Sequence, residues 1–483
     1  DGFSCCVSPH DNLEETMKEN RIAGFFKGVG NTFGFIGTAF TKGDWKTKLS
    51  FIIMGFGSLM RKQFARGIAF LAVEVLYIWY IVSFGAGYIK DFGTLGTVAT
   101  REEPAYFNGV EIGKTTVLGD NSFLILLFSV MTLFITALFV VIWYINIKNN
   151  YESQLRLEAG RKLPTNKQDL SSLLDHNFDK TLLAIPVFGV FMFVVVPIVF
   201  MIMVAFTNYD ATHQPPTNLF SWVGFENFKN LLSIGGSGFG STFFTVLGWT
   251  LVWAFFATFL NYFGGMAVAI LINKKGIKFK KLWRTILVMT IAVPQFVSLL
   301  YVGKMFAKDG LINGYLMKWG WIDNAIPFWT DPLLAKVTII LINVWVGIPY
   351  VMLITTGLLM NIPEDLYESA RIDGANPWQM FRKITLPYML FVTGPYLLTS
   401  FTGNLNNFNV IYLLNTGSPL STELTGGAGR TDLLITWLYK LTVNDTNYRM
   451  AAVIGIMVFV VTAVISLMVY NILPSVKDEE GFQ

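Results

Sequence analysis

Few side chains in this 483-residue chain could do hydrolytic, redox or metal chemistry. Its three histidines, His10, His176 and His213, are far apart in the sequence, and its only two cysteines, Cys5 and Cys6, are adjacent. Adjacent cysteines supply neither a disulfide framework nor a spaced zinc site. The motifs H-E-x-x-H and G-x-S-x-G are both absent. The sequence therefore predicts no metal site, no cofactor and no catalytic centre.

The nearest match to a phosphate-binding loop is incomplete. Between Gly109 and Gly113, which precedes Lys114 and Thr115, there are three residues where such a loop has four. We interpret this stretch as a turn in an exposed loop. The glycine-rich segment 234–241 follows no predicted strand and is expected to be a flexible connection. An ATP-driven process would therefore need its nucleotide site on another chain.

Side-chain amides within an apolar stretch indicate a possible binding site better than the histidines and cysteines do. Four asparagines, including Asn404 and Asn407, lie between positions 404 and 409 of the uncharged segment 388–422, where an unpaired amide is costly. Because Asn404 and Asn407 are three residues apart, we expect both on one helix face, where their donors and acceptors suit hydroxyl groups. Tyr350 adds a ring and a hydroxyl. Hydrogen bonding between helices explains such amides equally well, so the residues alone leave both interpretations open.

The elements that must position these groups are apolar helices. The chain is 53% hydrophobic and only 14% charged, which argues against a soluble globular protein. An uncharged run of about 20 residues spans the hydrocarbon core of a bilayer as a helix. We therefore predict an all-α membrane protein with about eight transmembrane helices, at about 67–89, 123–147, 181–206, 243–272, 285–303, 337–360, 388–412 and 450–473.

The basic residues predict the orientation of these spans. With the N-terminus inside, the inner segments hold 25 of the 36 lysines and arginines. The short loop 273–284 alone carries six of them, whereas 205–241 carries only Lys229. Basic residues concentrate in cytoplasmic loops, so we expect both termini in the cytoplasm.

The N-terminal part contains one ionisable group at membrane depth and two short apolar segments. Glu74 lies within the first predicted span, so we expect it to have a partner or to sit near an interface, in a structural role. Apolar residues from Ile22 to Ile36 follow a helical period, which could place a helix along the inner membrane surface. The segment 49–60 is too short to span.

The inner loop 361–387 predicts two short helices in succession. Gly374 can end the first helix by adopting a positive φ. Asn376 is a plausible N-cap for the second, and Gln379 stands three residues later, as in a capping box. We expect Pro387 to end this second helix.

At these residues the sequence resembles the "EAA" loop of bacterial ABC import permeases. The resemblance rests on Glu368-Ser369-Ala370, Asp373-Gly374-Ala375 and Ile384-x-Leu386-Pro387, with Ser369 in place of the usual alanine. It implies that the loop docks in a cleft of a cytoplasmic ATPase. The coupling residues implied in this way are Glu368, Ser369, Ala370, Asp373, Gly374, Ile384, Leu386 and Pro387.

The wider sequence resembles the larger permease subunit of maltose/maltodextrin importers. The resemblance implies a cytoplasmic or interfacial segment 1–66, two additional transmembrane helices within 67–180, a six-helix permease core at 181–476 and a cytoplasmic tail at 477–483. It also implies that the substrate contacts Gly347, Tyr350, Gly403, Asn404 and Asn407. Gly403 departs from the enterobacterial type, which has a sugar-stacking phenylalanine there, and the outer loop 207–242 is much shorter than in that type.

The function implied by the resemblance is that of a non-catalytic permease subunit of an ATP-driven oligosaccharide importer in the bacterial cytoplasmic membrane. Its implied partners are a second permease, two ATPase subunits, an extracytoplasmic solute-binding protein, membrane lipid and a maltose/maltodextrin-type sugar, with no nucleic acid. Another oligosaccharide is an open alternative. An ion-coupled secondary transporter would need ionisable groups at mid-membrane, and predicted spans two to eight contain none.

Overall fold

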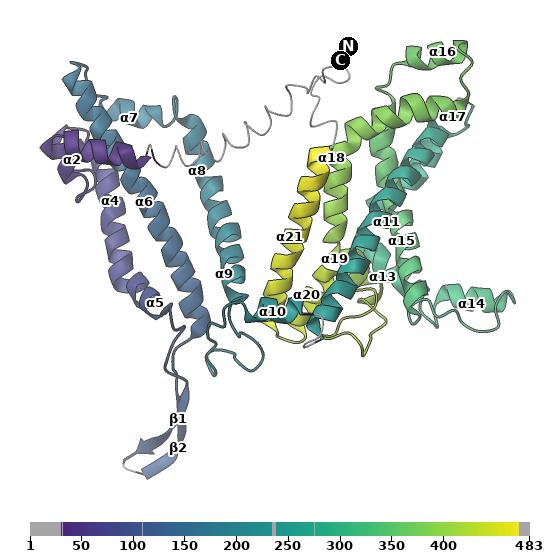
Figure 1. Cartoon of the computed structure of the whole chain (residues 1–483), viewed down its shortest axis with the longest axis horizontal. Helices are drawn as coiled ribbons and strands as arrows, with labels where there is room; N and C mark the ends of the chain where they lie inside the picture. Colours follow the sequence, from purple (N-terminus) through teal and green to yellow (C-terminus); the bar gives the residue numbers. More distant parts are fainter. Residues whose placement is uncertain (1–29, 31, 109, 234–237, 275, 473–483) are drawn as a thin grey trace, which may run out of the picture. The chain divides into compact units, whose positions relative to one another are not determined.

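The computed structural model describes residues 30, 32–108, 110–233, 238–274 and 276–472 (Figure 1). Among them, seven helices are long and apolar enough to cross a membrane, and a bent pair of helices makes an eighth span if the two are counted together. The prediction of an all-α membrane protein with about eight spans is therefore confirmed. Most of the predicted Ile22–Ile36 surface helix and residues 234–237 lie outside the described residues. The prediction of a flexible connection over 234–241 is wrong for residues 239–241, which are helical.

The chain divides into two compact units. The first comprises residues 1–200 and 215–219, and the second comprises residues 201–214 and 220–483. The first unit contains the first two spans and most of the third. Its elements are α2 (Trp45–Leu49), α3 (Phe56–Met60), α4 (Phe64–Tyr80), η1 (Ile81–Gly85), α5 (Ala86–Asp91), β1 (Arg101–Phe107), β2 (Val110–Val117), α6 (Ser122–Glu158), α7 (Asn166–Ser172), α8 (Phe178–Val190), η2 (Phe191–Val195) and the beginning of α9 (Val196–Val204).

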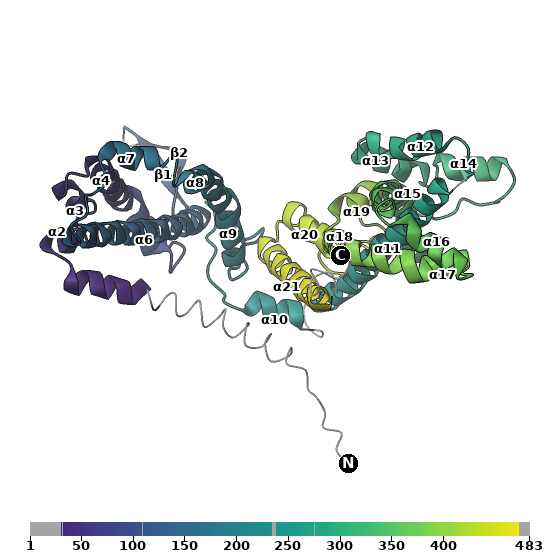
Figure 2. The ribbon, with the colours of Figure 1, turned by 90° about the horizontal axis from the view of Figure 1, so that it is seen from above.

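Buried polar side chains hold the short helices α2 and α3 against one end of α6 (Figure 2). The Arg61 side chain is 1% exposed and donates hydrogen bonds to Asp44 at 2.7 Å, Thr47 at 2.9 Å and Asn150 at 3.2 Å. A buried cation is stable only when it is paired and hydrogen-bonded. The 49–60 segment is thus part of a packed turn against α6 and does not span.

Glu74 has a hydrogen-bond partner, as the sequence predicted. Its Oε2 accepts a hydrogen bond from the backbone N–H of Met54 at 2.8 Å. Met54 belongs to the turn between α2 and α3, so this carboxylate ties that turn to the first span. The contact supports a structural role for Glu74.

The loop between the first and second spans forms a β-hairpin that the sequence did not predict. Strands β1 and β2 pair antiparallel, with Arg101 opposite Val117 and an irregularity at Ala105/Tyr106. Lys114 of β2 contacts Glu102 of β1 at 3.0 Å. The interpretation of the Gly113–Thr115 region as a turn is therefore wrong, because these residues lie within β2.

The second unit contains the remaining spans. Its elements are the end of α9, α10 (Glu226–Leu232), α11 (Phe239–Asn273), α12 (Lys280–Ala292), α13 (Gln295–Met305), α14 (Leu311–Lys318), α15 (Pro332–Leu359), α16 (Glu364–Ile372), α17 (Pro377–Met380), η3 (Phe381–Thr385), α18 (Leu386–Leu405), α19 (Phe408–Asn415), α20 (Leu434–Val443) and α21 (Tyr448–Ile472). The C-terminal tail 477–483 lies outside the described residues.

Close packing of α11 on α15 forms the centre of this unit (Figures 1 and 2). A methyl group on Gly265 would lie 2.6 Å from Cβ of Val351, and one on Gly264 would lie 2.7 Å from Cδ1 of Ile348. Small residues let membrane helices approach closely. One buried cluster includes Tyr262 and Met266 of α11, Val351 of α15 and Met389 of α18.

The predicted fifth span, 285–303, is not one straight helix. It consists of α12 and α13, which meet at an angle of 92°. Val293 and Pro294 between them are extended, with ψ of 128° and 126°. Proline lacks an N–H and disfavours helical backbone at the preceding residue, so the helix breaks here. Pro349 and Pro395 lie inside α15 and α18, which continue past them.

The predicted seventh span, 388–412, is also two helices. Helix α18 ends at Leu405, and α19 begins at Phe408. The expectation that Asn404 and Asn407 share one helix face is therefore wrong: Asn407 is the N-cap residue of α19, and its side chain accepts a hydrogen bond from the N–H of Val410.

A buried ion pair joins the loop after α19 to α20 and yields a prediction about stability. Asp432 and Lys440 are 2.6 Å apart, with side chains 0% and 8% exposed. We expect Asp432→Ala to destabilise the unit by about 3–5 kcal/mol, because the Lys440 ammonium would stay buried without its partner. As a control, Glu423→Ala removes an ion pair with Arg430 in which Glu423 is 75% exposed, and should cost at most about 1 kcal/mol. Thermal unfolding of the detergent-solubilised protein distinguishes them; equal losses would contradict the prediction.

Candidate functional site

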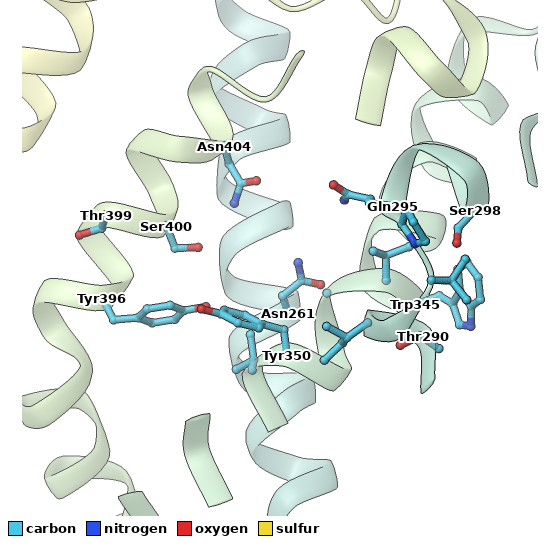
Figure 3. Close-up of a pocket in the computed structure, with 16 residues that line it drawn as sticks. Asn261, Thr290, Gln295, Ser298, Trp345, Tyr350, Tyr396, Thr399, Ser400 and Asn404 are labelled. Carbon is cyan, nitrogen blue, oxygen red and sulfur yellow. The ribbon is translucent and has the colours of Figure 1, made fainter. Parts of the chain in front are cut away.

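A cavity of about 540 Å³ opens among four helical segments of the second unit (Figure 3). Helices α11, α15 and α18 contribute to it, as does the break between α12 and α13. Pro294 thus shapes the cavity directly. The lining residues are Asn261, Thr290, Ile291, Val293, Pro294, Gln295, Ser298, Trp345, Val346, Gly347, Tyr350, Val351, Tyr396, Thr399, Ser400 and Asn404.

The lining combines aromatic rings with uncharged hydrogen-bonding groups. Tyr350 and Tyr396 point toward one another on one side, and Trp345 lies on another (Figure 3). Tyr350 and Trp345 are 54% and 49% exposed, so their rings are accessible. None of the lining residues is charged. Rings provide apolar faces, and amides and hydroxyls provide donors and acceptors, so the cavity suits a neutral, polyhydroxylated molecule.

Of the five residues implied as substrate contacts, the structure brings three to the cavity. Gly347, Tyr350 and Asn404 line it, whereas Gly403 and Asn407 do not. Gly403 is exposed, and a methyl group there would meet nothing within 4 Å. Asn407 supports a lining residue from outside the cavity: its Nδ2 donates a hydrogen bond to Oδ1 of Asn404 at 3.2 Å.

Hydrogen bonds fix the orientation of Asn404. Its Nδ2 donates to Oγ1 of Thr258 on α11 at 3.0 Å, and its backbone oxygen accepts from Nε1 of Trp253 at 3.1 Å. With Asn407 these contacts hold the amide at the cavity wall. Each polar atom keeps capacity for one further bond, since an amide oxygen has two lone pairs and an amide nitrogen has two hydrogens.

The 361–387 hairpin has the local geometry that the sequence predicted. Helix α16 ends in a Schellman motif: the N–H of Gly374 donates to the oxygen of Arg371 at 3.1 Å, and that of Ala375 donates to Ala370 at 2.8 Å. Gly374 has φ of 78°. Asn376 and Gln379 form the predicted capping box.

The end of the hairpin differs from the prediction. Pro387 does not terminate the second helix, which continues through the π-helical turn η3 into α18. The backbone N–H of Leu386 donates to the oxygen of Phe381, five residues earlier, so the helix widens just before the proline. The hairpin is therefore rigidly continuous with a transmembrane span (Figure 1).

The implied coupling residues divide into an exposed set and a packed set. Glu368, Ser369, Asp373, Gly374 and Pro387 are exposed, whereas Ala370, Ile384 and Leu386 are partly buried. Exposed apolar side chains accompany the first set, with Ile372 86% and Trp378 68% exposed. A tip with exposed apolar groups is typical of a docking surface.

Packed side chains connect the hairpin with the cavity. The Tyr367 hydroxyl lies 2.8 Å from Oγ1 of the buried Thr385, which joins α16 to the base of α18. Phe381 and Leu386 pack on the cluster of Tyr262, Met266, Val351 and Met389. Val351 itself lines the cavity, and Tyr262 follows the cavity residue Asn261. The hairpin and the cavity thus contact the same buried cluster.

No metal site is found in the part of the chain that the structure describes. His213 interacts with Asp210 at 2.9 Å, and Asp210 also pairs with Arg449 at 3.1 Å. Burial raises the pKa of Asp210, but hydrogen bonds from Thr212 and His213 and the charge of Arg449 outweigh it and hold the pKa below its usual value. This ion-pair group is structural. His10 lies outside the described residues.

Similarity to known proteins agrees with this geometry. Residues 262–478 match the family described as "binding-protein-dependent transport system inner membrane component". The chain is 35% identical to the galactooligosaccharides transport system permease protein GanP of Bacillus subtilis (strain 168), over 89% of this chain and 97% of that protein. The chain belongs to this permease family.

This permease is also similar to a second sequence relative and to a solved structure. It is 35% identical to the maltodextrin transport system permease protein MalC of Streptococcus pneumoniae (serotype 4, strain ATCC BAA-334 / TIGR4), over 90% of this chain and 97% of that protein. A bacterial ABC transporter involved in the import of the acidic polysaccharide alginate has the same fold, with a TM-score of 0.51 and 23% identity over 63% of this chain and 97% of that chain.

Several cavity residues of the permease escaped the sequence-based prediction. They are Asn261 on α11, Gln295 and Ser298 after the helix break, and Tyr396 on α18. Asn261 had the same signal as Asn404, an amide inside a long apolar run. Gln295, Ser298 and Tyr396 gave no signal of their own, because such residues occur at membrane-helix contacts generally.

Proposed function

We propose that this permease is the transmembrane subunit of an ATP-driven importer for maltose/maltodextrin-type oligosaccharides. The observation that carries the proposal is the charge-free cavity lined by aromatic rings and uncharged polar groups. Neutral sugars bind by stacking on rings and by hydrogen bonding of their hydroxyls. Curated relatives named as maltodextrin permeases, with 34–35% identity over nine-tenths of the chain, support the substrate class.

The proposed membrane arrangement follows the distribution of basic residues. Both termini lie in the cytoplasm, and the 361–387 hairpin lies on the same side. A second permease completes the passage, two ATPase subunits bind the hairpins, and an extracytoplasmic binding protein delivers the sugar. Hydrolysis of ATP takes place on the separate ATPase chains.

The proposed coupling is a population shift. ATP binding changes the cleft into which the hairpin docks, and the hairpin binds one form of the cleft better than the other. This difference in binding free energy shifts the passage between its outward-open and inward-open forms. The rigid continuity of η3 with α18 supports transmission of the movement into the wall of the cavity.

A galacto-oligosaccharide is the second candidate substrate, favoured by the similarity to the galactooligosaccharides permease GanP. Rings and amides do not by themselves discriminate between glucose and galactose linkages. An ion-coupled secondary transporter is not favoured, because no charged residue lines the cavity. Helix α15 begins before the predicted span and includes Lys336 in its first turns. The Lys336 ammonium lies 4.7 Å from the centre of the Trp249 ring.

Reconstitution of the complete transporter tests the proposal. The permease is purified with its partner chains and placed in proteoliposomes with the binding protein, and uptake of labelled maltotriose and galactotriose is measured with and without ATP. We expect ATP-dependent uptake of at least one sugar. Uptake that continues without the ATPase chains, or that needs an ion gradient, would contradict the proposal.

A further inference from the structure

We propose that Asn261 is a specificity-determining residue of the cavity, which reads a hydroxyl of the substrate and is positioned by Gly347. This inference rests on the proposed sugar-import function and names a contact within the same site. It concerns helix α11, which carries none of the implied substrate contacts.

The first observation is an unsatisfied amide at the cavity. Asn261 lines the cavity from the middle of α11, and its Oδ1 is buried with no hydrogen-bond partner among the described residues. A buried polar atom without a partner is costly, so such atoms in native proteins call for an explanation. Oδ1 is sealed from the cavity, so the end of the amide that a sugar hydroxyl can reach is Nδ2. Nδ2 has no hydrogen-bond partner among the described residues either, and it would donate to an oxygen of that hydroxyl.

The second observation is the space that Gly347 leaves. A methyl group on Gly347 would overlap the Asn261 amide, whose Nδ2, Cγ and Oδ1 are the nearest atoms to it. The amide of Asn261 thus occupies the position that any other residue at 347 would fill with its side chain. Gly347, implied as a substrate contact, has its main effect through Asn261, which it allows to lie flat against α15 and face the cavity.

The third observation is the contrast with Asn404. Its amide already bonds to Thr258 and Asn407, so the protein itself satisfies much of its hydrogen-bonding capacity. Among the described residues the amide of Asn261 makes no such hydrogen bond, and it lines the same cavity between Asn404 and Tyr350 (Figure 3). The two amides lie beside the tyrosine rings and offer two hydrogen-bonding groups to a ligand. The protein itself fixes the Asn404 amide, whereas the Asn261 amide gains its hydrogen-bond partner only when the ligand binds.

Replacement of Asn261 by the isosteric leucine tests the inference. In the complete transporter in proteoliposomes, uptake of labelled maltotriose and galactotriose is measured at subsaturating sugar. Asn261→Leu should lower uptake of the transported sugar about tenfold, because a hydroxyl would be buried against an apolar group. The matched control is Asn343→Leu: Asn343 has a buried, unpartnered Nδ2 on α15 but does not line the cavity. Its uptake should stay at the wild-type level.

A second pair of variants separates sugar recognition from helix packing. Gly347→Ala should lower both the thermal stability of the transporter and its sugar uptake, because the new methyl group displaces the Asn261 amide. The double variant Gly347→Ala, Asn261→Ala removes the overlap. It should regain stability and still take up sugar about tenfold more slowly than the wild type.

Three outcomes decide the matter. Normal uptake by Asn261→Leu would overturn the inference, as would equal losses in Asn261→Leu and Asn343→Leu, since both would then reflect packing alone. Recovery of uptake in the double variant would also overturn it. Failure of the proposed function has a different signature, in which the wild-type transporter itself takes up neither sugar with ATP.

Discussion

Replacing Gly374 with valine is expected to reduce ATP-driven sugar uptake by about 10- to 100-fold, corresponding to loss of a coupling free energy of the usual size. Gly374 ends α16 with φ of 78°, in a region where a β-branched residue is a severe outlier. The valine would open the Schellman turn and redirect α16. Uptake is measured in proteoliposomes, and ATP hydrolysis is followed in the same preparation.

Two companion variants make this result specific. A methyl group on Gly374 would meet nothing within 4 Å. The valine therefore destabilises the turn through its backbone conformation and not through a steric clash with neighbouring residues. Asparagine tolerates positive φ better than valine does, and Gly374→Asn should therefore retain more uptake. Gly320 ends α14 with φ of 71°, the same hydrogen-bond pattern and the same open space. Gly320→Val applies the same strain to a loop that carries no coupling role.

The expected pattern is strong loss in Gly374→Val, partial loss in Gly374→Asn and near-normal uptake in Gly320→Val. Membrane insertion should be intact in all three, because no span is altered. Normal uptake by Gly374→Val would remove the hairpin from the coupling mechanism. Equal losses in Gly374→Val and Gly320→Val would mean that local destabilisation, rather than docking, causes the effect.

The 361–387 hairpin could be predicted because its determinants are local. Gly374 stops α16 through its own φ, and Asn376 and Gln379 cap the next helix within one turn. The spans could be predicted for a similar reason, since each is one long apolar run. The exception at Pro387 is instructive: the rule that proline ends a helix failed because the π-helical turn before it accommodates the missing N–H.

The cavity could be predicted only in part, because it is assembled from segments far apart in the sequence. The residue types and the resemblance together indicate Tyr350 and Asn404, but nothing in the sequence places Asn261 of α11 against Gly347 of α15. That contact depends on the close approach of the two helices at Gly264 and Gly265. The break at Pro294 places Gln295 and Ser298 at the cavity, although the sequence alone predicts a single span there.

The β-hairpin was missed for a different reason. Its strands carry charged and small residues, such as Glu102, Glu103 and Lys114, and only Val110-Glu111-Ile112 alternates apolar with polar positions. So short an alternation does not stand out as a period-two pattern.

Asn404→Leu is expected to lower sugar uptake more than any other single replacement in the cavity, by about 10- to 100-fold. The change removes one contact to the sugar and leaves a sugar hydroxyl against an apolar group. It also removes the hydrogen-bond partner of the Thr258 and Asn407 side chains, both of which bond to Asn404. Leucine keeps the branched shape of the asparagine side chain and removes its polar groups. Uptake at subsaturating and saturating sugar distinguishes weaker binding from slower transport.

Asn407→Ala should behave differently, although the sequence gave both asparagines the same role. Asn407 caps α19 through the N–H of Val410, so its loss should cost about 1 kcal/mol of stability. Its effect on uptake should be small, because it reaches the sugar only through Asn404. The double variant should take up sugar no more slowly than Asn404→Leu alone, since residues that act through one contact are not additive. If Asn407→Ala instead matched Asn404→Leu in uptake, or their losses multiplied in the double variant, Asn407 would contact the sugar itself and the break between α18 and α19 would have to close during transport.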